Sequence, residues 1–310
     1  MTPLRKAIDE YLMMRRSLGF KLVDMGYNLR HFASFMGHQK ASVITTKLAL
    51  RWAVEPREVL PAQWAARLSY VRSFARYWSA VDSRTEIPPV GLLPYRFQRT
   101  TPYIYSEAEI QRLLKAARTL RPERGLRPWT YYSIFGLLAV TGMRVGEVIR
   151  LTRADVDLAQ GLLTVRRTKF GKSRLIPIHT STVKMLSRYV RLRDQLHSRP
   201  STPRFFLSNQ GRPITDCIVR WTFVKLTRQI GLRAAGASTG PRMHDLRHCF
   251  AVTTLLRWYR DGVDVEQRLP VLSTFLGHGH VTDTYWYLSA VPELLALTKD
   301  RLEKRWEVLQ

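Results

Sequence analysis

The sequence predicts a mainly α-helical protein with one small antiparallel β-sheet, built from two domains. Three observations lead to this prediction. Apolar residues recur at helical spacing along most of the chain, a proline-rich stretch interrupts that pattern, and two short strand-like segments flank a basic turn. A chain of 310 residues is also long enough for two domains of ordinary size.

Residues 1–87 are expected to form a small helical bundle. The first helix follows Leu4, Ile8 and Leu12, which share one face, and it ends before Gly19. Three more helices are expected, over residues 24–38, 45–54 and 61–80. The last of these helices carries a basic outer face, formed by Arg67, Arg72 and Arg76.

Residues 88–104 are predicted to be an extended linker. Four prolines occur in the stretch EIPPVGLLPYRFQRTTP, residues 86–102. Because proline lacks the backbone N–H group and clashes with the preceding helical turn, no helix can run through this stretch. Its composition favours an extended and rather stiff connection.

Residues 105–310 are expected to form a second domain of mixed structure. It opens at Ser106, a helix cap that is followed by acidic residues in the first turn. An apolar helix over 129–140 ends at Thr141-Gly142, and a short helix begins at Arg144. Two strands and six further helices are expected, the strands over 162–167 and 173–179 and the helices over 181–197, 216–230, 244–259, 265–276, 282–290 and 293–308.

The charge of the chain indicates a polyanionic partner. Fifty Lys and Arg residues against 24 Asp and Glu give a formal net charge of +26. Nucleic acid neutralises such a charge and releases counterions, whereas a membrane partner is disfavoured because the most apolar segment, 133–140, is too short to span a bilayer. Cys217 and Cys249 match neither a metal-binding spacing nor a disulfide framework, which favours the reducing cytoplasm.

Four short segments of the second domain carry candidate catalytic residues: TGMRVGE (141–147), TKFGKSR (168–174), HDLRH (244–248) and LGHGHVTDTYWYL (276–288). Arg144 and Arg247 are each unremarkable alone, but two guanidinium groups suit a phosphodiester whose phosphorus gains negative charge during attack. Glu147 is expected to orient a neighbouring side chain. Lys169 lies in the turn between the strands and could protonate a leaving 5′-hydroxyl, with Lys172 and Arg174 as alternatives.

The histidines and tyrosines of these segments leave alternatives open. His244 and His248 have the i, i+4 spacing of zinc ligands, but the segment lacks the HExxH glutamate and a third ligand. We therefore expect His244 to bind a phosphate oxygen or to assist transfer of the nucleophile's proton, and His248 to be structural. Tyr285 and Tyr287 are equivalent candidate nucleophiles by position, and both follow His278.

In this order, the four segments resemble the tyrosine recombinase (phage integrase-like) family. The family pattern runs through an arginine after Thr-Gly, a hairpin lysine, a His-x-x-Arg pair, a Leu-Gly-His and a tyrosine nine residues later. The resemblance implies that Arg144 and Arg247 hold the scissile phosphate and that Lys169 is the general acid. It implies further roles for His244 in proton transfer, for His278 at a non-bridging oxygen, and for Tyr287, selected by the nine-residue spacing, as the nucleophile. The product would be a 3′-phosphotyrosyl link, formed without ATP, metal or other cofactor.

The resemblance also implies an architecture and partners. Residues 1–87 would be a core-binding (SAM-like) DNA-binding domain and 105–310 the catalytic domain with a C-terminal tail. The partner would be double-stranded DNA, bound by a homotetramer on two sites, with accessory recombinases or factors as further candidate partners. The expected location is the cytoplasm, in association with the nucleoid. The tail has an apolar face for a neighbouring subunit or for its own domain, formed by Leu294, Leu295, Leu297 and Leu302. The candidate DNA contacts are Arg67, Arg72, Arg76, Arg166, Lys172 and Arg174.

The biological context stays open at this point. A recombinase encoded by a mobile element is the first interpretation, with a phage integrase or a resolvase of chromosome dimers as variants of it. A non-catalytic DNA-binding protein of the same fold and a type IB-like topoisomerase are the alternatives. Exchange of strands between two duplexes would distinguish the recombinase from the topoisomerase.

Overall fold

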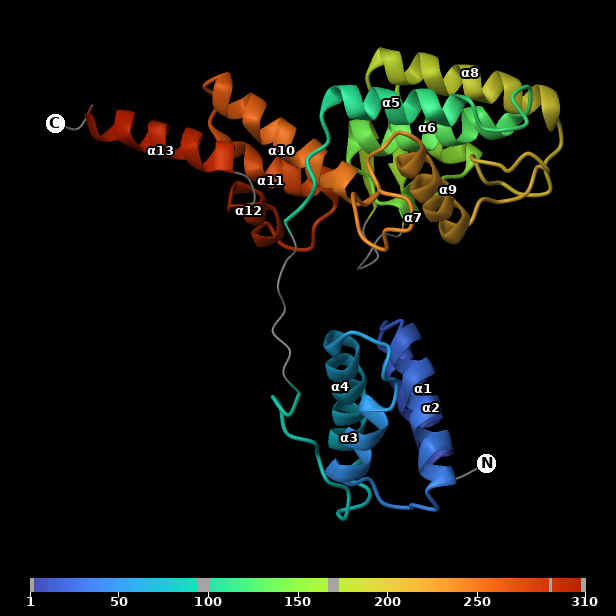
Figure 1. Ribbon diagram of the computed structural model, residues 1–310, viewed down its shortest axis with the longest axis vertical. Helices are drawn as coiled ribbons and strands as arrows, with labels where there is room; N and C mark the ends of the chain where they lie inside the picture. Colours follow the sequence, from blue (N-terminus) through green and yellow to red (C-terminus); the bar gives the residue numbers. More distant parts are fainter. Residues whose placement is uncertain (1–2, 94–100, 167–172, 290–291, 308–310) are drawn as a thin grey trace. The chain divides into compact units, whose positions relative to one another are not determined.

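The computed structural model describes residues 3–93, 101–166, 173–289 and 292–307 (Figure 1). The chain divides into two compact units, Met1–Thr100 and Thr101–Gln310. Helices dominate the described residues, and the strands among them form one small antiparallel sheet. The predicted fold class is therefore confirmed.

The first unit is a helical bundle around an aromatic core. Its helices within residues 3–93 are α1 (Pro3–Ser17), α2 (Val23–His38), α3 (Thr46–Val54) and α4 (Pro61–Trp78). Phe32, Trp52 and Phe74 are almost completely buried, and the rings of Phe32 and Trp52 meet edge to face with centroids 5.2 Å apart. Such aromatic pairs stabilise a bundle beyond the area that they bury. Gly19 follows α1 with a positive φ of 90°, where the sequence predicts the helix to stop.

The second unit is built around the apolar helix α6. Its described helices are α5 (Glu107–Arg118), α6 (Leu126–Thr141), α7 (Val145–Arg150), η1 (Arg153–Asp155), α8 (Thr180–Leu196), α9 (Asp216–Gln229), α10 (Asp245–Arg260), α11 (Val265–Leu276), α12 (Thr282–Ser289) and α13 (Pro292–Glu307). Helices α5, α8 and α10 pack against α6, whose side chains are buried on several faces. Ser106 caps α5 as predicted, and it forms a capping box with Glu109.

A three-stranded sheet with the order β1-β2-β3 accompanies these helices within the described residues. Its strands are β1 (Val156–Asp157), β2 (Leu162–Val165) and β3 (Arg174–Pro177). Leu163 of β2 faces Ile176 of β3, and both side chains are fully buried. This register joins the two strands that flank the turn carrying Lys169, which lies outside the described residues.

A second apolar cluster of this unit lies toward the C-terminus. Helices α10, α11, α12 and the start of α13 share an apolar cluster that includes Leu255, Leu276 and Leu294. Figure 1 shows the remainder of α13 extending away from its unit. Pro270 lies inside α11 without ending it, so this helix covers the predicted span despite the proline. No helix in the described part of the chain is long and apolar enough to cross a membrane.

Candidate active site

Arg144 is held at the start of α7 by the glutamate three residues later. Gly142 ends α6 in the left-handed region, with φ of 60°, and the chain turns directly into α7. The Glu147 carboxylate accepts hydrogen bonds from the Arg144 backbone N–H and from Nη1, both at 3.0 Å. Arg144 Nη2 donates to the Gly277 carbonyl at 3.1 Å. Glu147 thus orients a neighbouring side chain, as its spacing indicates, and Arg144 remains 31% exposed.

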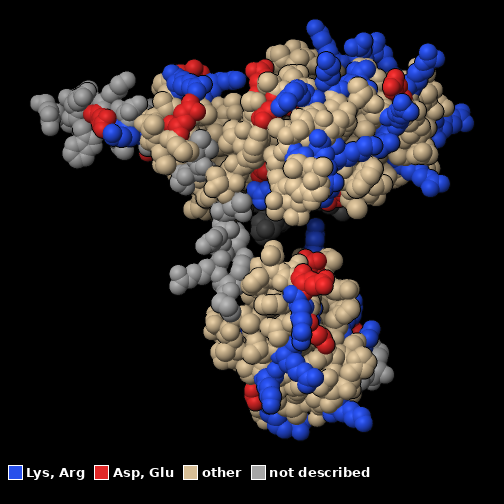
Figure 2. All heavy atoms as spheres, viewed as in Figure 1, with Lys and Arg blue, Asp and Glu red and all other residues tan. Residues whose placement is uncertain are grey.

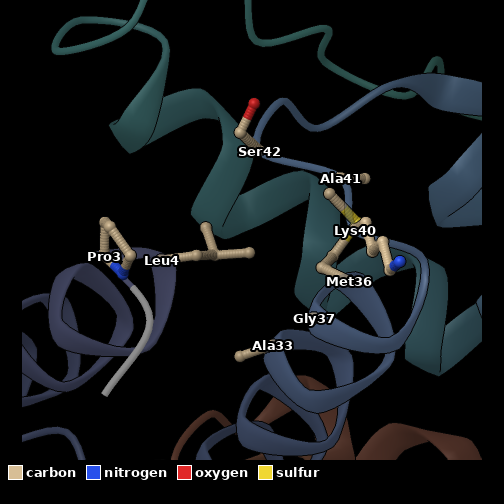
Figure 3. Close-up of a pocket in the computed structure, with 8 residues that line it drawn as sticks. All are labelled: Pro3, Leu4, Ala33, Met36, Gly37, Lys40, Ala41 and Ser42. Carbon is tan, nitrogen blue, oxygen red and sulfur yellow. The ribbon is translucent and has the colours of Figure 1, made fainter.

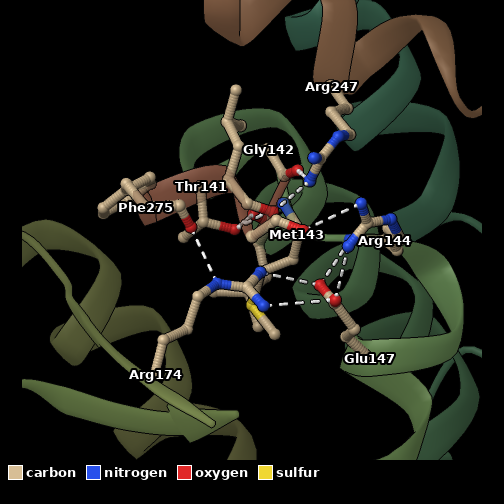
Figure 4. Close-up of polar contacts among 11 residues, drawn as sticks. Thr141, Gly142, Met143, Arg144, Glu147, Arg174, Arg247 and Phe275 are labelled. Carbon is tan, nitrogen blue, oxygen red and sulfur yellow. Dashed lines mark hydrogen bonds and ion pairs between the residues drawn. The ribbon is translucent and has the colours of Figure 1, made fainter. Parts of the chain in front are cut away.

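Arg174 lies on the other side of the same carboxylate (Figure 4). Its Nη2 and Nη1 atoms donate to the two oxygens of Glu147 at 2.8 and 3.2 Å, and its Nε donates to the Phe275 carbonyl at 2.8 Å. The Arg174 side chain is only 8% exposed. The sequence predicts Arg174 to be a DNA contact or a substitute for Lys169, yet the structure directs all three nitrogens of its guanidinium group toward protein acceptors.

Arg247 is buried on the first turns of α10, and its Nη1 donates to the carbonyls of Gly142 at 2.7 Å and Leu276 at 2.9 Å. Its Nη2 is buried without a hydrogen-bond partner in the described part of the chain. Burial, followed by the charge of Arg144, lowers the pKa of Arg247 to about 10. Figure 4 shows the guanidinium groups of Arg247 and Arg144 next to each other. Within the described residues the Nη2 donor of Arg247 therefore has no acceptor, and two positive charges lie side by side.

Three histidines and Tyr287 form an aromatic cluster. The rings of His244 and His248 meet edge to face, with centroids 4.7 Å apart. His248 Nδ1 lies 3.3 Å from the Tyr287 hydroxyl, and the His278 ring stacks on Tyr287 with centroids 6.1 Å apart. His278 Nδ1 shares a 2.7 Å hydrogen bond with the buried Thr284 hydroxyl. The cluster therefore brings the end of α11, α12 and the start of α10 together around one phenol.

The surroundings favour the neutral form of these histidines. Burial is the largest cause that lowers the pKa of His248 and His278 to about 4, and nearby positive charges act in the same direction. Burial and the charge of Arg247 also lower the pKa of His244 to about 4, although part of its side chain remains exposed to solvent. At neutral pH all three rings can therefore accept a proton or a hydrogen bond.

This charge state predicts a loss of stability in mild acid. Because the folded pKa values of His248 and His278 lie below the unfolded value near 6.5, the unfolded chain binds more protons as the pH falls from 6.5 toward 4. The thermal midpoint of the second unit should fall by roughly 5 °C between pH 7 and pH 5. His248→Gln should reduce this decrease and His38→Gln, at an exposed position of the first unit, should not; equal slopes in all three proteins would contradict the prediction.

The structure separates Tyr285 from Tyr287. Tyr285 is 49% exposed, whereas Tyr287 is 2% exposed and belongs to the apolar cluster of α10–α13. Sequence reasoning took His248 for a structural residue, but its ring nitrogen approaches the Tyr287 hydroxyl. It also missed Thr284, whose position three residues before Tyr287 on the same helix was the available signal.

Most of the predicted DNA-contact arginines have partners within the protein. Arg166 pairs with the buried Asp155 at 2.5 Å but keeps 63% of its side chain exposed. Arg67 covers the Trp52 ring and donates to the Trp52 carbonyl, and Arg72 donates to the carbonyls of Pro88 and Pro89. Arg76 is exposed. Lys169 and Lys172 lie outside the described residues.

On the face shown in Figure 2, Lys and Arg side chains are spread over both units, with Asp and Glu side chains among them. The first unit also has a surface hollow between α1, α2 and the loop after α2 (Figure 3). Its lining is mostly apolar and consists of Pro3, Leu4, Ala33, Met36, Gly37, Lys40, Ala41 and Ser42. None of the predicted site residues lines this hollow. Among the described residues, no group of three or more His, Cys, Asp or Glu side chains could hold a metal ion.

Comparisons with known proteins identify the family of this chain. Residues 104–293 match the model of the phage integrase family. The putative integrase/recombinase y4rB of Sinorhizobium fredii (strain NBRC 101917 / NGR234) is 51% identical over 99% of both chains. The tyrosine recombinase XerD of Staphylococcus haemolyticus (strain JCSC1435) is 32% identical over 71% of this chain and 69% of its own.

A solved structure shares the fold. The Tn1549 transposon integrase in complex with transposon right end DNA superposes with a TM-score of 0.69 at 15% identity, covering 98% of this chain and 99% of the other. The family model and the two relatives confirm the resemblance indicated by the four motifs. The chain belongs to the phage integrase family of tyrosine recombinases, the enzymes that cut DNA strands at specific sites and rejoin them.

Proposed function

We propose that Arg144 and Arg247 bind the scissile phosphate of DNA and that Tyr287 attacks its phosphorus. The observation that carries this proposal is the buried Nη2 of Arg247, which lies beside a second arginine and lacks a partner in the described residues. A phosphate oxygen would supply both the missing acceptor and the missing negative charge. Charge that develops on the five-coordinate phosphorus would strengthen these bonds in the transition state.

The chemical step exchanges one phosphoester for another. The Tyr287 oxygen forms a bond to phosphorus, the bond to the 5′-oxygen breaks, and the DNA is left with a 3′-phosphotyrosyl link and a free 5′-hydroxyl. In this proposal the phenol proton passes to a neutral histidine, either His248, whose Nδ1 lies 3.3 Å from the hydroxyl, or the adjacent His244, and Lys169 protonates the leaving oxygen. Attack by another 5′-hydroxyl on the link restores the phosphodiester and releases Tyr287.

Because Tyr287 is buried, the proposed step requires a change of conformation. Its hydroxyl lies against His248 inside the α10–α13 cluster, so α12 has to shift before the oxygen reaches phosphorus. Binding of DNA is expected to favour that shift, because phosphate neutralises the arginines packed beside the cluster. The tail, in which Leu294 is buried and Leu295 is 51% exposed, would then contact a neighbouring subunit.

The partner and assembly follow from the reaction. Exchange between two duplexes requires cleavage of four strands, and each subunit carries one Tyr287, so four copies would act on two DNA sites. Arg76, Arg166 and Lys172 are proposed DNA contacts, and the nucleoid is the proposed place of action. A recombinase of a mobile element is the proposed context, supported by the description of y4rB as an integrase/recombinase and by the fold shared with the integrase of the Tn1549 transposon.

Covalent capture tests the proposal. The full chain is expressed in cells that carry its native flanking DNA, the lysate is denatured, and DNA attached to protein is sequenced. Mass spectrometry of the attached peptide is expected to find the nucleotide on Tyr287, and the sequenced ends to converge on defined sites. Nucleotide on Tyr285, or no attached DNA despite tight binding, would contradict the proposal. Scattered ends with relaxation of single duplexes would instead support a topoisomerase.

A further inference from the structure

Glu147 is a buried carboxylate shared by two arginines. It is 3% exposed, and it accepts hydrogen bonds from Arg144 on one side and Arg174 on the other. Two positive groups and one negative group leave the set with a net charge of +1. With Arg174 absent, Glu147 would neutralise Arg144 almost completely, because opposite charges in contact at low dielectric interact strongly.

The geometry of Arg174 fits a contact with Glu147 rather than a contact with DNA. Its planar guanidinium group matches both carboxylate oxygens at 2.8 and 3.2 Å, the paired geometry that arginine forms and lysine cannot. Its third nitrogen is occupied by the Phe275 carbonyl, and its side chain is 8% exposed. Figure 4 shows the Arg174 side chain extending toward Glu147, with Arg144 on the other side of the carboxylate.

The same side chain joins three segments that carry the proposed active site. Arg174 begins β3, directly after the turn of Lys169, and Glu147 lies in α7 beside Arg144. Phe275 lies near the end of α11, two residues before Gly277, whose carbonyl accepts the second bond of Arg144. A Cβ atom at Gly277 would lie 2.6 Å from Arg174 Nη1, so the turn that precedes His278 closes directly on this side chain.

We propose that Arg174 is a positioning residue: it neutralises Glu147, and thereby leaves Arg144 its full charge for the scissile phosphate. The inference rests on the proposed function of Arg144. Glu147 thus orients Arg144 by hydrogen bonds, while Arg174 prevents the same carboxylate from cancelling the charge that it orients.

The charge state of Glu147 agrees with this role. Burial by itself would raise the pKa of Glu147, but the hydrogen bonds and charge of Arg174, followed by those of Arg144, hold it below its usual value. Glu147 is therefore ionised at neutral pH, and its negative charge is present for Arg174 to offset.

The test is a double-mutant cycle on single-turnover cleavage of the captured duplex. Arg174→Met should slow cleavage by about 100-fold in the presence of Glu147, but by less than about threefold in the Glu147→Gln background, where no carboxylate remains to neutralise Arg144. Arg174→Lys, which keeps the charge and loses the paired geometry, should recover to within about tenfold of the unmutated chain. A purely structural role would not produce this dependence on the charge of residue 147.

Two further measurements distinguish a positioning role of Arg174 from a DNA contact and from the general effect of losing a buried arginine. Affinity for the captured duplex, and its dependence on salt, should change by less than about threefold in Arg174→Met, since the side chain is buried. Arg193→Met, at an arginine of α8 with a side chain 5% exposed, is the matched control for loss of a buried arginine and should leave cleavage per folded molecule unchanged.

Each remaining outcome counts against the inference. Losses that multiply in the double variant would overturn it, as would a weakened affinity with a reduced salt slope, which would make Arg174 a DNA contact. Normal cleavage by Arg174→Met would overturn it and leave the proposed function intact. Absence of covalent attachment in the unmutated chain would overturn both.

Discussion

Tyr287→Phe is expected to abolish covalent attachment of DNA, a decrease of more than about 10⁴-fold, because no other group replaces the attacking oxygen. The change removes one oxygen atom and keeps the aromatic ring that stacks on His278. The free energy of unfolding should therefore change by less than about 1 kcal/mol. Covalent capture and thermal unfolding of the same preparation measure the two quantities.

Tyr285→Phe is the matched control. Tyr285 lies on the same helix, two residues earlier, but it is 49% exposed, whereas Tyr287 is 2% exposed and lies against His248. The control should attach DNA within about threefold of the unmutated chain. The nucleophile would have to be reassigned if attachment persisted in Tyr287→Phe and disappeared in Tyr285→Phe.

Arg247→Met is expected to slow cleavage by at least about 10³-fold, the effect of removing a preorganised donor from a developing negative charge. Its effect on stability should be unusually small for a buried residue. Burial and the charge of Arg144 lower the pKa of Arg247, so the surroundings disfavour its charged form, and this works against the gain from its two hydrogen bonds to Gly142 and Leu276. The free energy of unfolding should therefore change by no more than about 1 kcal/mol.

Arg193→Met is expected to have the opposite effects, a loss of stability without a loss of cleavage. Arg193 is also buried, but it donates to the carbonyls of Phe205 and Arg204 and pairs with the half-exposed Asp194, so no excess charge is relieved by its removal. We expect a loss of about 2–3 kcal/mol in the free energy of unfolding, with cleavage per folded molecule unchanged. Chemical denaturation and single-turnover cleavage distinguish the two variants. If Arg247→Met lost as much stability as Arg193→Met, Arg247 would be chiefly structural.

Local patterns predicted much of this protein. Helix α5 begins at the expected Ser106 cap and α6 ends at the expected Gly142, because capping and positive φ depend on residues within one turn. The strand β1 was not predicted, since its two residues form a strand only by pairing with β2. The type of reaction could also be predicted from the sequence, because each candidate catalytic arginine, histidine or tyrosine lies within a short motif.

The sequence by itself therefore determined the helical class, the second domain's motifs and the candidate chemistry. Only the tertiary structure decided which side chains share an environment. Arg174 reads as an exposed hairpin residue, yet it pairs with Glu147, 27 residues earlier, and with Phe275, 101 residues later. Tyr285 and Tyr287 are equivalent by position until packing buries one of them. Burial and charge neutralisation depend on segments far apart in the chain, and local spacing carries no information about which of those segments meet.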